Sequence, residues 1–452
     1  MMQTSTLALS TAVSLALGAL TLSACGDPVG PAPSSKAPVT IGVSMGFSGG
    51  LASTTQDLRA AVRMAEHHIN ASGGILGGRP VSFDIVDDNS NADVNTGSGV
   101  LLRVADGLVA KQTIGMLGPV GSGQVAALGD WIAANQRVVI SPSATADSLT
   151  ASGSFSGFFF RTAPPDSRQV KALVNILKNG PRGTFANSTT TCKRLGIFST
   201  QGPYQQGLKD GLKAAWLAEG GGTTVSAFEP PSSETSGSNF ATEVAFLKGK
   251  GVDCLAVLAY ESGASAFLRT LATTEEAVFN GLQLRVGPEA LYSTKFIQAA
   301  NQNIGTASKP AGNFVGAVPA PDASRTAYNH WLSVLSGYDP ATVAAGKSAS
   351  FFASTYDAAI LMALAAHQSK GAQGPALRDA LRAVASGGDA YTPLTLPDAI
   401  RAISDGGNVN YDGASGDCDF DAKGDVVTGF QVWRVETDQL VITRAIKAGE
   451  LQ

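Results

Sequence analysis

Short apolar segments alternate with segments of helical period along most of the chain, and this alternation constrains the fold more than any other feature. In the first half, the apolar segments are residues 39–44, 81–86, 113–117 and 137–141. Between the first two, Leu58, Val62 and Ile69 recur at the spacing that places them on one face of a helix. Strands that alternate with helices predict a parallel sheet covered by helices on both faces.

The same alternation returns in the second half of the chain. There the apolar segments are residues 195–199, 225–228, 252–259 and 284–287. A chain of 452 residues is longer than a single core usually supports. We therefore expect an α/β protein with two doubly wound parallel-sheet lobes. Residues 255–258 are apolar throughout, as expected of a strand that is buried on both faces.

Two proline-bearing segments are candidates for the connections between the lobes. Pro164 and Pro165 follow an apolar segment and prevent an immediate continuation into a helix. Residues 315–321 form the second candidate connection. After it, the sequence predicts helices over 324–335, 351–367 and 375–385, then a turn-rich return and a final strand around 430–433.

The first 24 residues are typical of an export leader. Residues 5–24 are uncharged and largely apolar. The run Leu22-Ser23-Ala24-Cys25 closes this segment, and a Pro/Ser/Ala-rich stretch follows to Pro38. We expect a signal peptide over 1–24 and a tether over 25–38. The Leu-Ser-Ala-Cys run resembles the lipobox of bacterial lipoproteins, which implies that Cys25 carries a lipid. A plain signal peptide and a membrane anchor are the alternatives.

Composition argues against several classes of function. Only 15% of the residues are charged, the net charge is −4 and no basic run occurs, so nucleic acid and anionic membrane surfaces are poor partners. The chain has no P-loop. His67 and His68 are adjacent and would face different sides of a helix, so they do not make a metal pair. We expect no cofactor, no metal and no enzymatic activity.

Three cysteines follow Cys25, and an exported protein can oxidise two of them. Cys254 lies inside an apolar run and is expected to be a buried strand residue. Cys192 and Cys418 both flank strands at polar positions, so we predict that they pair. No cysteine spacing fits a zinc site.

Five motifs occur in an order that points to a known family. They are residues 69–79 followed by Asp87-Asp88, residues 140–145, residues 160–163 with Asp166, Gly287-Pro288-Glu289, and residues 411–416 with 420–421 and 424–425. In this order they resemble the leucine/isoleucine/valine-binding proteins, which are type I periplasmic solute-binding proteins of ATP-binding-cassette importers. The resemblance extends over residues 39–440.

The resemblance implies two lobes joined by three crossovers, with a ligand in the cleft between them. We expect lobe 1 to comprise 39–163 plus 317–426, and lobe 2 to comprise 164–316 plus 427–452. It also implies a monomer, in the periplasm or at the cell surface, that delivers an amino acid or similar small amphipathic solute to a membrane permease. The alternative is a receptor domain that senses an amide, urea or small organic acid.

Three candidate ligand contacts follow strands of the first lobe. Ser122 ends a glycine-rich loop and opens a helix, and the resemblance makes it a ligand for a carboxylate; a simple helix cap is the alternative. Ala144 and Thr145 follow another strand. By resemblance they offer backbone groups and a hydroxyl to the ligand, although a turn with a helix cap would look the same. Phe47 is a weaker candidate.

Three further candidates follow strands of the second lobe. Glu289 comes directly after 284–287, and the resemblance implies that it pairs with a ligand ammonium; an exposed loop glutamate is the alternative. Tyr204 and Tyr260 end two other strands, where aromatic rings can cover an aliphatic ligand or face a cation.

Overall fold

The first lobe is built on a five-stranded parallel sheet in the order β2-β1-β3-β4-β5. Its strands are β1 (Val39–Met45), β2 (Val81–Asp87), β3 (Met116–Leu117), β4 (Val139–Ser141) and β5 (Phe159–Arg161). β1 lies inside the sheet, and six of its seven residues are buried. This burial on both faces explains its continuous apolar sequence.

The second lobe is built on a seven-stranded sheet in the order β14-β13-β10-β9-β8-β6-β7. Its strands are β6 (Arg194–Ser199), β7 (Thr223–Thr224), β8 (Cys254–Leu258), β9 (Leu284–Gly287), β10 (Phe314–Ala320), β13 (Gly429–Glu436) and β14 (Gln439–Ile446). The sheet is parallel from β10 to β7, but β13 pairs antiparallel with β10 and β14 pairs antiparallel with β13. The second sheet is therefore mixed at one edge, where the sequence predicted parallel strands only.

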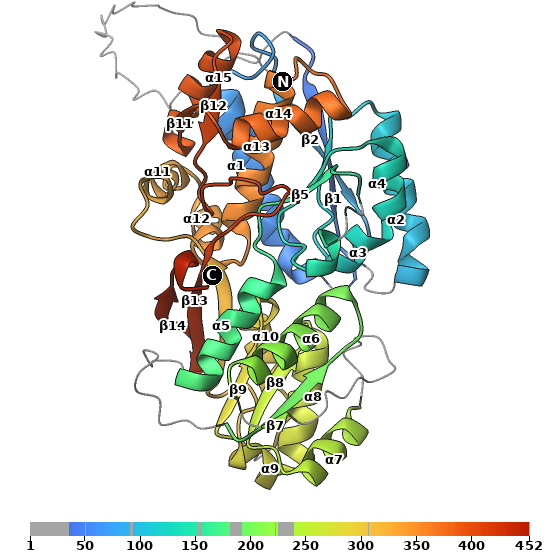
Figure 1. The fold of residues 1–452 in the computed structure, drawn as a ribbon, viewed down its shortest axis with the longest axis vertical. Helices are drawn as coiled ribbons and strands as arrows, with labels where there is room; N and C mark the ends of the chain where they lie inside the picture. Colours follow the sequence, from blue (N-terminus) through green and yellow to red (C-terminus); the bar gives the residue numbers. More distant parts are fainter. Residues whose placement is uncertain are drawn as a thin grey trace, which may run out of the picture. The chain divides into compact units, whose positions relative to one another are not determined.

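Helices from two distant parts of the chain share the core of the first lobe (Figure 1). The blue and cyan part contributes α1 (Ala52–Ala71), α2 (Val94–Ala110), α3 (Ser122–Ala127) and α4 (Gly129–Asn135). The orange part contributes α11 (Thr326–Leu335), α12 (Pro340–Ser348), α13 (Phe352–Gln368), α14 (Pro375–Ala385) and α15 (Leu396–Ser404), with the short strands β11 (Asp389–Tyr391) and β12 (Val409–Tyr411).

Helices cover both faces of the second sheet. They are α5 (Asp166–Asn179), α6 (Pro203–Ala218), α7 (Ala241–Lys250), α8 (Glu261–Thr274), α9 (Glu276–Gly281) and α10 (Thr294–Asn301). Along β8 the side chains alternate between two apolar clusters: Ala256 and Leu258 belong to one, Leu255 and Val257 to the other. Since successive strand residues point to opposite faces, each face has its own core, as a doubly wound lobe requires.

Three crossovers join the lobes. The chain leaves the first sheet after β5, returns after β10, and leaves again before β13. The Thr428 hydroxyl donates to the carbonyl of Ser415 at 3.0 Å and lies 3.4 Å from that of Ala320, so the second and third crossovers are tied together. β10 runs through Ala320, across the boundary predicted at 316/317. The detailed lobe limits stay a prediction.

The computed structural model describes residues 36–49, 51–90, 94–151, 153, 155–180, 192–221, 223–224, 239–305 and 307–451. The predicted signal peptide, Cys25, nearly all of the tether and the predicted strand at 225–228 lie outside these residues. Among the helices in these ranges, none by itself has the length and apolar composition of a membrane span; α12 and α13 pass that test only as a pair bent by 103°.

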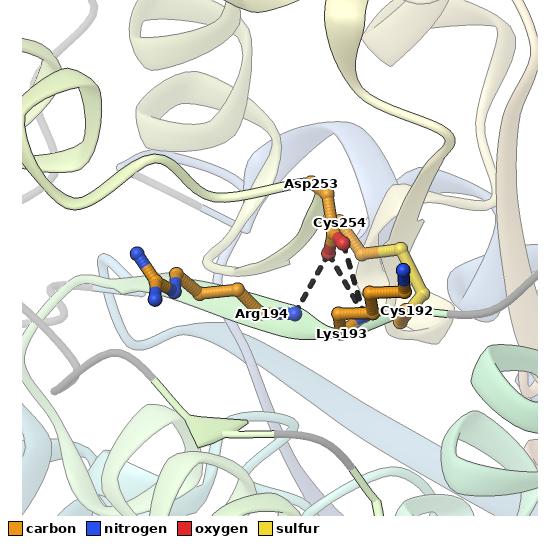
Figure 2. Close-up of a disulfide and its surroundings, with 5 residues drawn as sticks. All are labelled: Cys192, Lys193, Arg194, Asp253 and Cys254. Atoms are coloured by element: carbon orange, nitrogen blue, oxygen red, sulfur yellow. Dashed lines mark hydrogen bonds between the residues drawn. A yellow bond between two sulfur atoms is a disulfide. The ribbon is translucent and has the colours of Figure 1, made fainter.

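A disulfide joins Cys192 to Cys254, with 5.6 Å between their Cα atoms (Figure 2). Cys418 is a buried free thiol. The predicted pair Cys192–Cys418 is therefore wrong. The physical reason is the register of the second sheet: β6 and β8 are parallel neighbours with Leu195 opposite Cys254, so Cys192 lies beside the start of β8. Cys418 instead packs in the core of the first lobe.

Asp253 reinforces the same corner. Its carboxylate accepts backbone N–H groups from Lys193 and Arg194 at 2.8–3.1 Å (Figure 2). The disulfide and these hydrogen bonds together fasten the entrance of β6 to the entrance of β8. They lie at the amino ends of the strands, which is the opposite edge of the sheet from the loops that follow the strands.

The Cys192→Ser/Cys254→Ser variant is expected to unfold more easily than the wild type, by about 2–4 kcal/mol, because the disulfide closes a long loop in the unfolded chain. The cysteines are separated by 62 positions. Chemical denaturation with and without a reductant measures the effect. A reductant should destabilise the wild type and leave the double variant unchanged; equal sensitivity of both would contradict the assignment.

Candidate functional site

Loops that follow the strands of both sheets converge on one hollow between the lobes. Its lining residues are Leu51, Thr54, Val120, Gly121, Ser122, Ser143, Thr145, Tyr204, Tyr260, Glu261, Glu289, Ala290 and Phe351. Most of them come directly after β3, β4, β6, β8 or β9. The carboxyl ends of parallel strands are where open α/β sheets bind ligands, so the topology itself brings these side chains together.

Ser122 lies in this hollow, and its hydroxyl also connects two of the loops. Gly121, not Ser122, is the capping residue of α3, so the simple helix-cap interpretation of Ser122 does not describe the geometry. The Ser122 Oγ accepts the backbone N–H of Ala146 at 3.2 Å. The hydroxyl hydrogen can therefore still be donated to an acceptor in the hollow.

Thr145 lines the hollow, whereas Ala144 does not. The Thr145 hydroxyl is buried and has no well-formed hydrogen bond among the described residues, although it lies close enough to the Asp166 carboxylate to favour its charged form. The N–H of Ala144 donates to Ser141 Oγ at 3.0 Å, and its carbonyl accepts from the Arg161 guanidinium at 3.2 Å. Of this pair, Thr145 presents a group to the hollow, and the backbone groups of Ala144 already have partners.

Glu289 is a buried acid at the start of the 3-10 turn Glu289–Leu291, just beyond β9. Its side chain is only 4% exposed, and burial raises its pKa to about 7. The Tyr204 hydroxyl and the Gln169 amide lie beside it and favour the charged form. Neither satisfies the carboxylate fully: Glu289 Oε2 and the Tyr204 hydroxyl are both buried without a well-formed hydrogen bond to the described residues.

Asp166 is a second buried acid, although its place in the sequence predicts only a role in a crossover between the lobes. It is the first residue of α5, it is fully buried, and neither carboxylate oxygen has a well-formed hydrogen bond within the described chain. Burial and the nearby Glu289 raise its pKa well above the usual value. An acid in the first turn of a helix ordinarily stabilises the helix by its interaction with the helix dipole. This common role gives no sign that Asp166 also lies near Glu289.

Aromatic and apolar side chains complete the walls. The rings of Tyr204 and Tyr260 stack with centroids 5.2 Å apart and planes 14° apart. Phe351 and Leu51 face them from the first lobe. Phe351 has a φ of 63°, a left-handed conformation that is unusual for a bulky residue and often marks a functional position. Phe47 is not among the lining residues; the Arg59 guanidinium lies over its ring instead.

The hollow is suited to a cation at one end and a hydrogen-bond acceptor at the other. Its lining contains Glu261 and Glu289 but neither lysine nor arginine. Buried carboxylates without hydrogen-bond partners are costly unless a charged or donating group meets them. The hydroxyls of Ser122 and Thr145 can donate to a carboxylate.

Nothing in the described ranges forms a metal site: they contain no group of three or more His, Cys, Asp or Glu side chains that could hold an ion. Asp87 uses its carboxylate within its own loop, where it accepts from the backbone of Phe47 and Asn89. His67 and His68 contact different tyrosines, Tyr338 and Tyr356.

Two curated relatives share the organisation of this chain. A chemotactic signal transduction system substrate-binding protein of Halobacterium salinarum is 27% identical over 414 residues, which cover 90% of this chain and 89% of the relative. A Leu/Ile/Val-binding protein of Rhizobium johnstonii is 27% identical over 308 residues, which cover 66% of this chain and 78% of the relative.

Solved structures show the same fold at lower identity. A leucine-binding protein of Thermotoga maritima superimposes with a TM-score of 0.69 at 16% identity, covering 90% of this chain and 99% of that one. A solute-binding protein from R. palustris in complex with benzoate gives a TM-score of 0.63 at 17% identity, covering 91% and 96%. A family model described as periplasmic binding protein matches residues 38–404.

Proposed function

Since this chain belongs to the type I periplasmic binding protein family and is a binding protein rather than an enzyme, we propose that it captures an α-amino acid between its lobes. One observation carries the proposal: Glu289 Oε2 and both carboxylate oxygens of Asp166 are buried and have no well-formed hydrogen bond among the described residues. Delivery to an ATP-binding-cassette importer is part of the same proposal.

An α-amino acid supplies both charges that the site calls for. Its ammonium would meet the Glu289 carboxylate in a charge-assisted hydrogen bond, with Asp166 close by. Its carboxylate would accept from the hydroxyls of Ser122 and Thr145. Because Ser122 and Glu289 belong to opposite lobes, a ligand that contacts both would favour the closed cleft.

Affinity for an amino acid is expected to rise with pH up to about 7 and then to level off. The ammonium needs the Glu289 carboxylate, whose pKa is raised to about 7 by burial. Below that pH, binding must expel the carboxyl proton, so affinity falls toward about tenfold per pH unit. Calorimetry in buffers of different ionisation enthalpy measures the proton release, and a flat profile between pH 5 and 7 would contradict this role of Glu289.

The same shift affects the ligand-free fold in the opposite direction. The folded-state pKa of Glu289 lies above its usual value of 4.5, so folding favours the protonated acid. Its contribution to stability is present below pH 4.5 and is lost as the pH rises to about 7, by roughly 3 kcal/mol. Glu289→Gln should remove the pH dependence of affinity that comes from Glu289, together with its contribution to the pH dependence of stability.

A thermal-shift screen tests the proposed ligand class. A bound ligand raises the melting temperature by mass action. For any α-amino acid that gives a shift, the matched acid without the amino group and the matched amine without the carboxylate should each give little or none. A larger shift with the acid alone would contradict the proposal and favour an aromatic or aliphatic carboxylate, as in the benzoate-bound neighbour.

Sensing is a second candidate function. It is favoured by the relative from Halobacterium salinarum, which is named as part of a chemotactic signal transduction system and matches 90% of this chain. In that case the ligand-bound form would contact a transducer instead of a permease. Deletion of the gene in its host distinguishes the two: loss of labelled amino-acid uptake supports transport, whereas intact uptake with loss of the response to the ligand supports sensing.

We also propose that Cys25 anchors the mature protein to a membrane through acyl chains, which hold a soluble domain by burying methylenes. The proposal rests on Leu22-Ser23-Ala24-Cys25 and the Pro/Ser/Ala-rich stretch behind it. Cys25→Ser is expected to leave the protein unprocessed or unanchored. Absence of labelled fatty acid from the wild type, expressed in a bacterial host, would rule out lipidation.

A further inference from the structure

A second hollow adjoins the first at Glu289. Its lining includes Asp57, Lys295 and Ser350, which are absent from the lining of the first hollow. Five residues line both hollows: Thr54, Glu261, Glu289, Ala290 and Phe351. The two spaces are therefore compartments of one cleft. The second, at about 160 Å³, is larger than the first, at about 40 Å³.

The second compartment differs from the first in its charges. Asp57, on α1 of the first lobe, and Lys295, on α10 of the second lobe, line it from opposite sides of the cleft. The two groups attract each other: burial raises the pKa of Asp57, and the nearby Lys295 ammonium opposes the rise. A positively charged hydrogen-bond donor and a carboxylate acceptor thus line the same small space.

Hydroxyl groups add further hydrogen-bonding capacity. Ser350 has a buried Oγ with no hydrogen-bond partner among the described residues. Other hydroxyls already serve the local structure: Ser293 Oγ caps α10, and Ser348 Oγ donates to the carbonyl of Ala344 at 2.8 Å. The Ser350 hydroxyl can therefore form a hydrogen bond with a polar group of a ligand.

The position of Glu289 decides how an amino acid would use the two compartments. Glu289 lines both, so an ammonium bound to it sits at their junction. A carboxylate directed to Ser122 and Thr145 occupies the first compartment. The ligand side chain, which is the third substituent of the α-carbon, must then point away from the first compartment. The larger second compartment is the space that adjoins it.

We propose that the second compartment receives the ligand side chain and selects one that ends in a neutral group which both donates and accepts hydrogen bonds, such as a carboxamide or ureido group. This inference rests on the proposed function, because it needs the ammonium at Glu289. The amide oxygen would accept from Lys295, and the amide N–H groups would donate to Asp57 or to the Ser350 hydroxyl.

Other side chains fit this compartment less well. A hydrocarbon branch would remove water from Asp57, Lys295 and Ser350 and return no hydrogen bonds, and a site built to hydrogen-bond a ligand discriminates strongly against an analogue that lacks the polar group. A cationic end would be repelled by Lys295, which offsets part of its attraction to Asp57. An anionic end would face Asp57, with Glu261 and Glu289 also in the lining.

Titration calorimetry with near-isosteric amino acids tests the inference. L-Asparagine and L-leucine have similar shapes but opposite polarity at the end of the side chain, and L-glutamine and L-citrulline extend the amide series. We expect at least one of the three amide or ureido ligands to bind about tenfold or more tightly than L-leucine. Tighter binding of L-leucine than of all three would overturn the inference and leave the proposed function standing.

Lys295→Met separates this specificity from general binding. The variant keeps the length of the side chain and removes its charge. It should weaken the favoured amide or ureido ligand by about tenfold and leave L-leucine within about threefold, whereas Lys111→Met, at an exposed lysine outside both compartments, should change neither. Equal loss for both ligands would overturn the inference. Failure of every α-amino acid to bind the wild type would overturn the proposed function, and the inference with it.

Discussion

Glu289→Gln is expected to weaken amino-acid binding by roughly thirty-fold or more and to leave the fold intact. The substitution keeps the shape of the side chain and removes the charge that an ammonium would meet. Truncating one partner of a desolvated charge pair costs about 2–5 kcal/mol, which corresponds to this loss of affinity. Calorimetry with an amino acid that shifts the melting temperature measures it.

Stability should change in the opposite sense to affinity. In the ligand-free protein Glu289 is a buried acid with one oxygen lacking a hydrogen-bond partner in the described chain. Replacing it by a neutral amide should leave the ligand-free melting temperature above pH 7 unchanged or higher. Glu276→Gln, at an exposed position on α9, is the matched control and should alter neither quantity. Equal affinity of Glu289→Gln and wild type would remove Glu289 from the site.

Arg161→Met is expected to destabilise the protein by about 3–5 kcal/mol, because it leaves a partly buried carboxylate without its partner. The Arg161 side chain is fully buried and donates to Asp425 Oδ1 at 2.7 Å. It also donates to the carbonyl of Ala146 and to the Thr150 hydroxyl, each at 3.0 Å. The guanidinium thus joins the loop after β4, which carries Thr145, to the third crossover.

Denaturation by urea measures this effect, and a second variant identifies its cause. Asp425→Leu combined with Arg161→Met removes both charges, so the double variant should recover part of the stability that the single variant loses. The single variant should also bind ligand more weakly, since the loop that presents Thr145 loses its support. A loss of less than 1 kcal/mol in the single variant would contradict the structural role of the pair.

The central strands were predictable from the sequence, and the edge of the second sheet was not. β1, β6 and β8 are buried on both faces, and such burial leaves a continuous apolar run in the sequence. β14 is an edge strand whose residues are mostly exposed or half-buried, so its pattern is weak. Its pairing depends on the turn at Thr437 and Asp438, both of which have positive φ.

Pairings that depend on strand register were also beyond the sequence. The disulfide forms because β6 and β8 are neighbours in register, although β7 lies between them in the chain. The apolar run around Cys254 correctly predicts that this residue is buried. It does not indicate which residue of a neighbouring strand lies beside Cys254. The same limitation explains the wrong pairing of Cys192 with Cys418.

Residues of the candidate site were predictable where each one follows a different strand. Ser122, Thr145, Tyr204, Tyr260 and Glu289 all do so, and all five line the first compartment. Phe351 lines the compartment from the start of α13, and Asp166 lies near Glu289 from the first turn of α5. Their local patterns are those of an ordinary helix end, so only the three-dimensional arrangement reveals them.

A crystal structure with the amino acid that gives the largest thermal shift would show whether Glu289 binds the ligand ammonium. We expect the ammonium within about 2.7–2.9 Å of a Glu289 oxygen, as in other charge-assisted hydrogen bonds. We expect the carboxylate on the hydroxyls of Ser122 and Thr145, with both lobes in contact with the ligand. A ligand bound outside this cleft, or with its ammonium directed away from Glu289, would contradict the account.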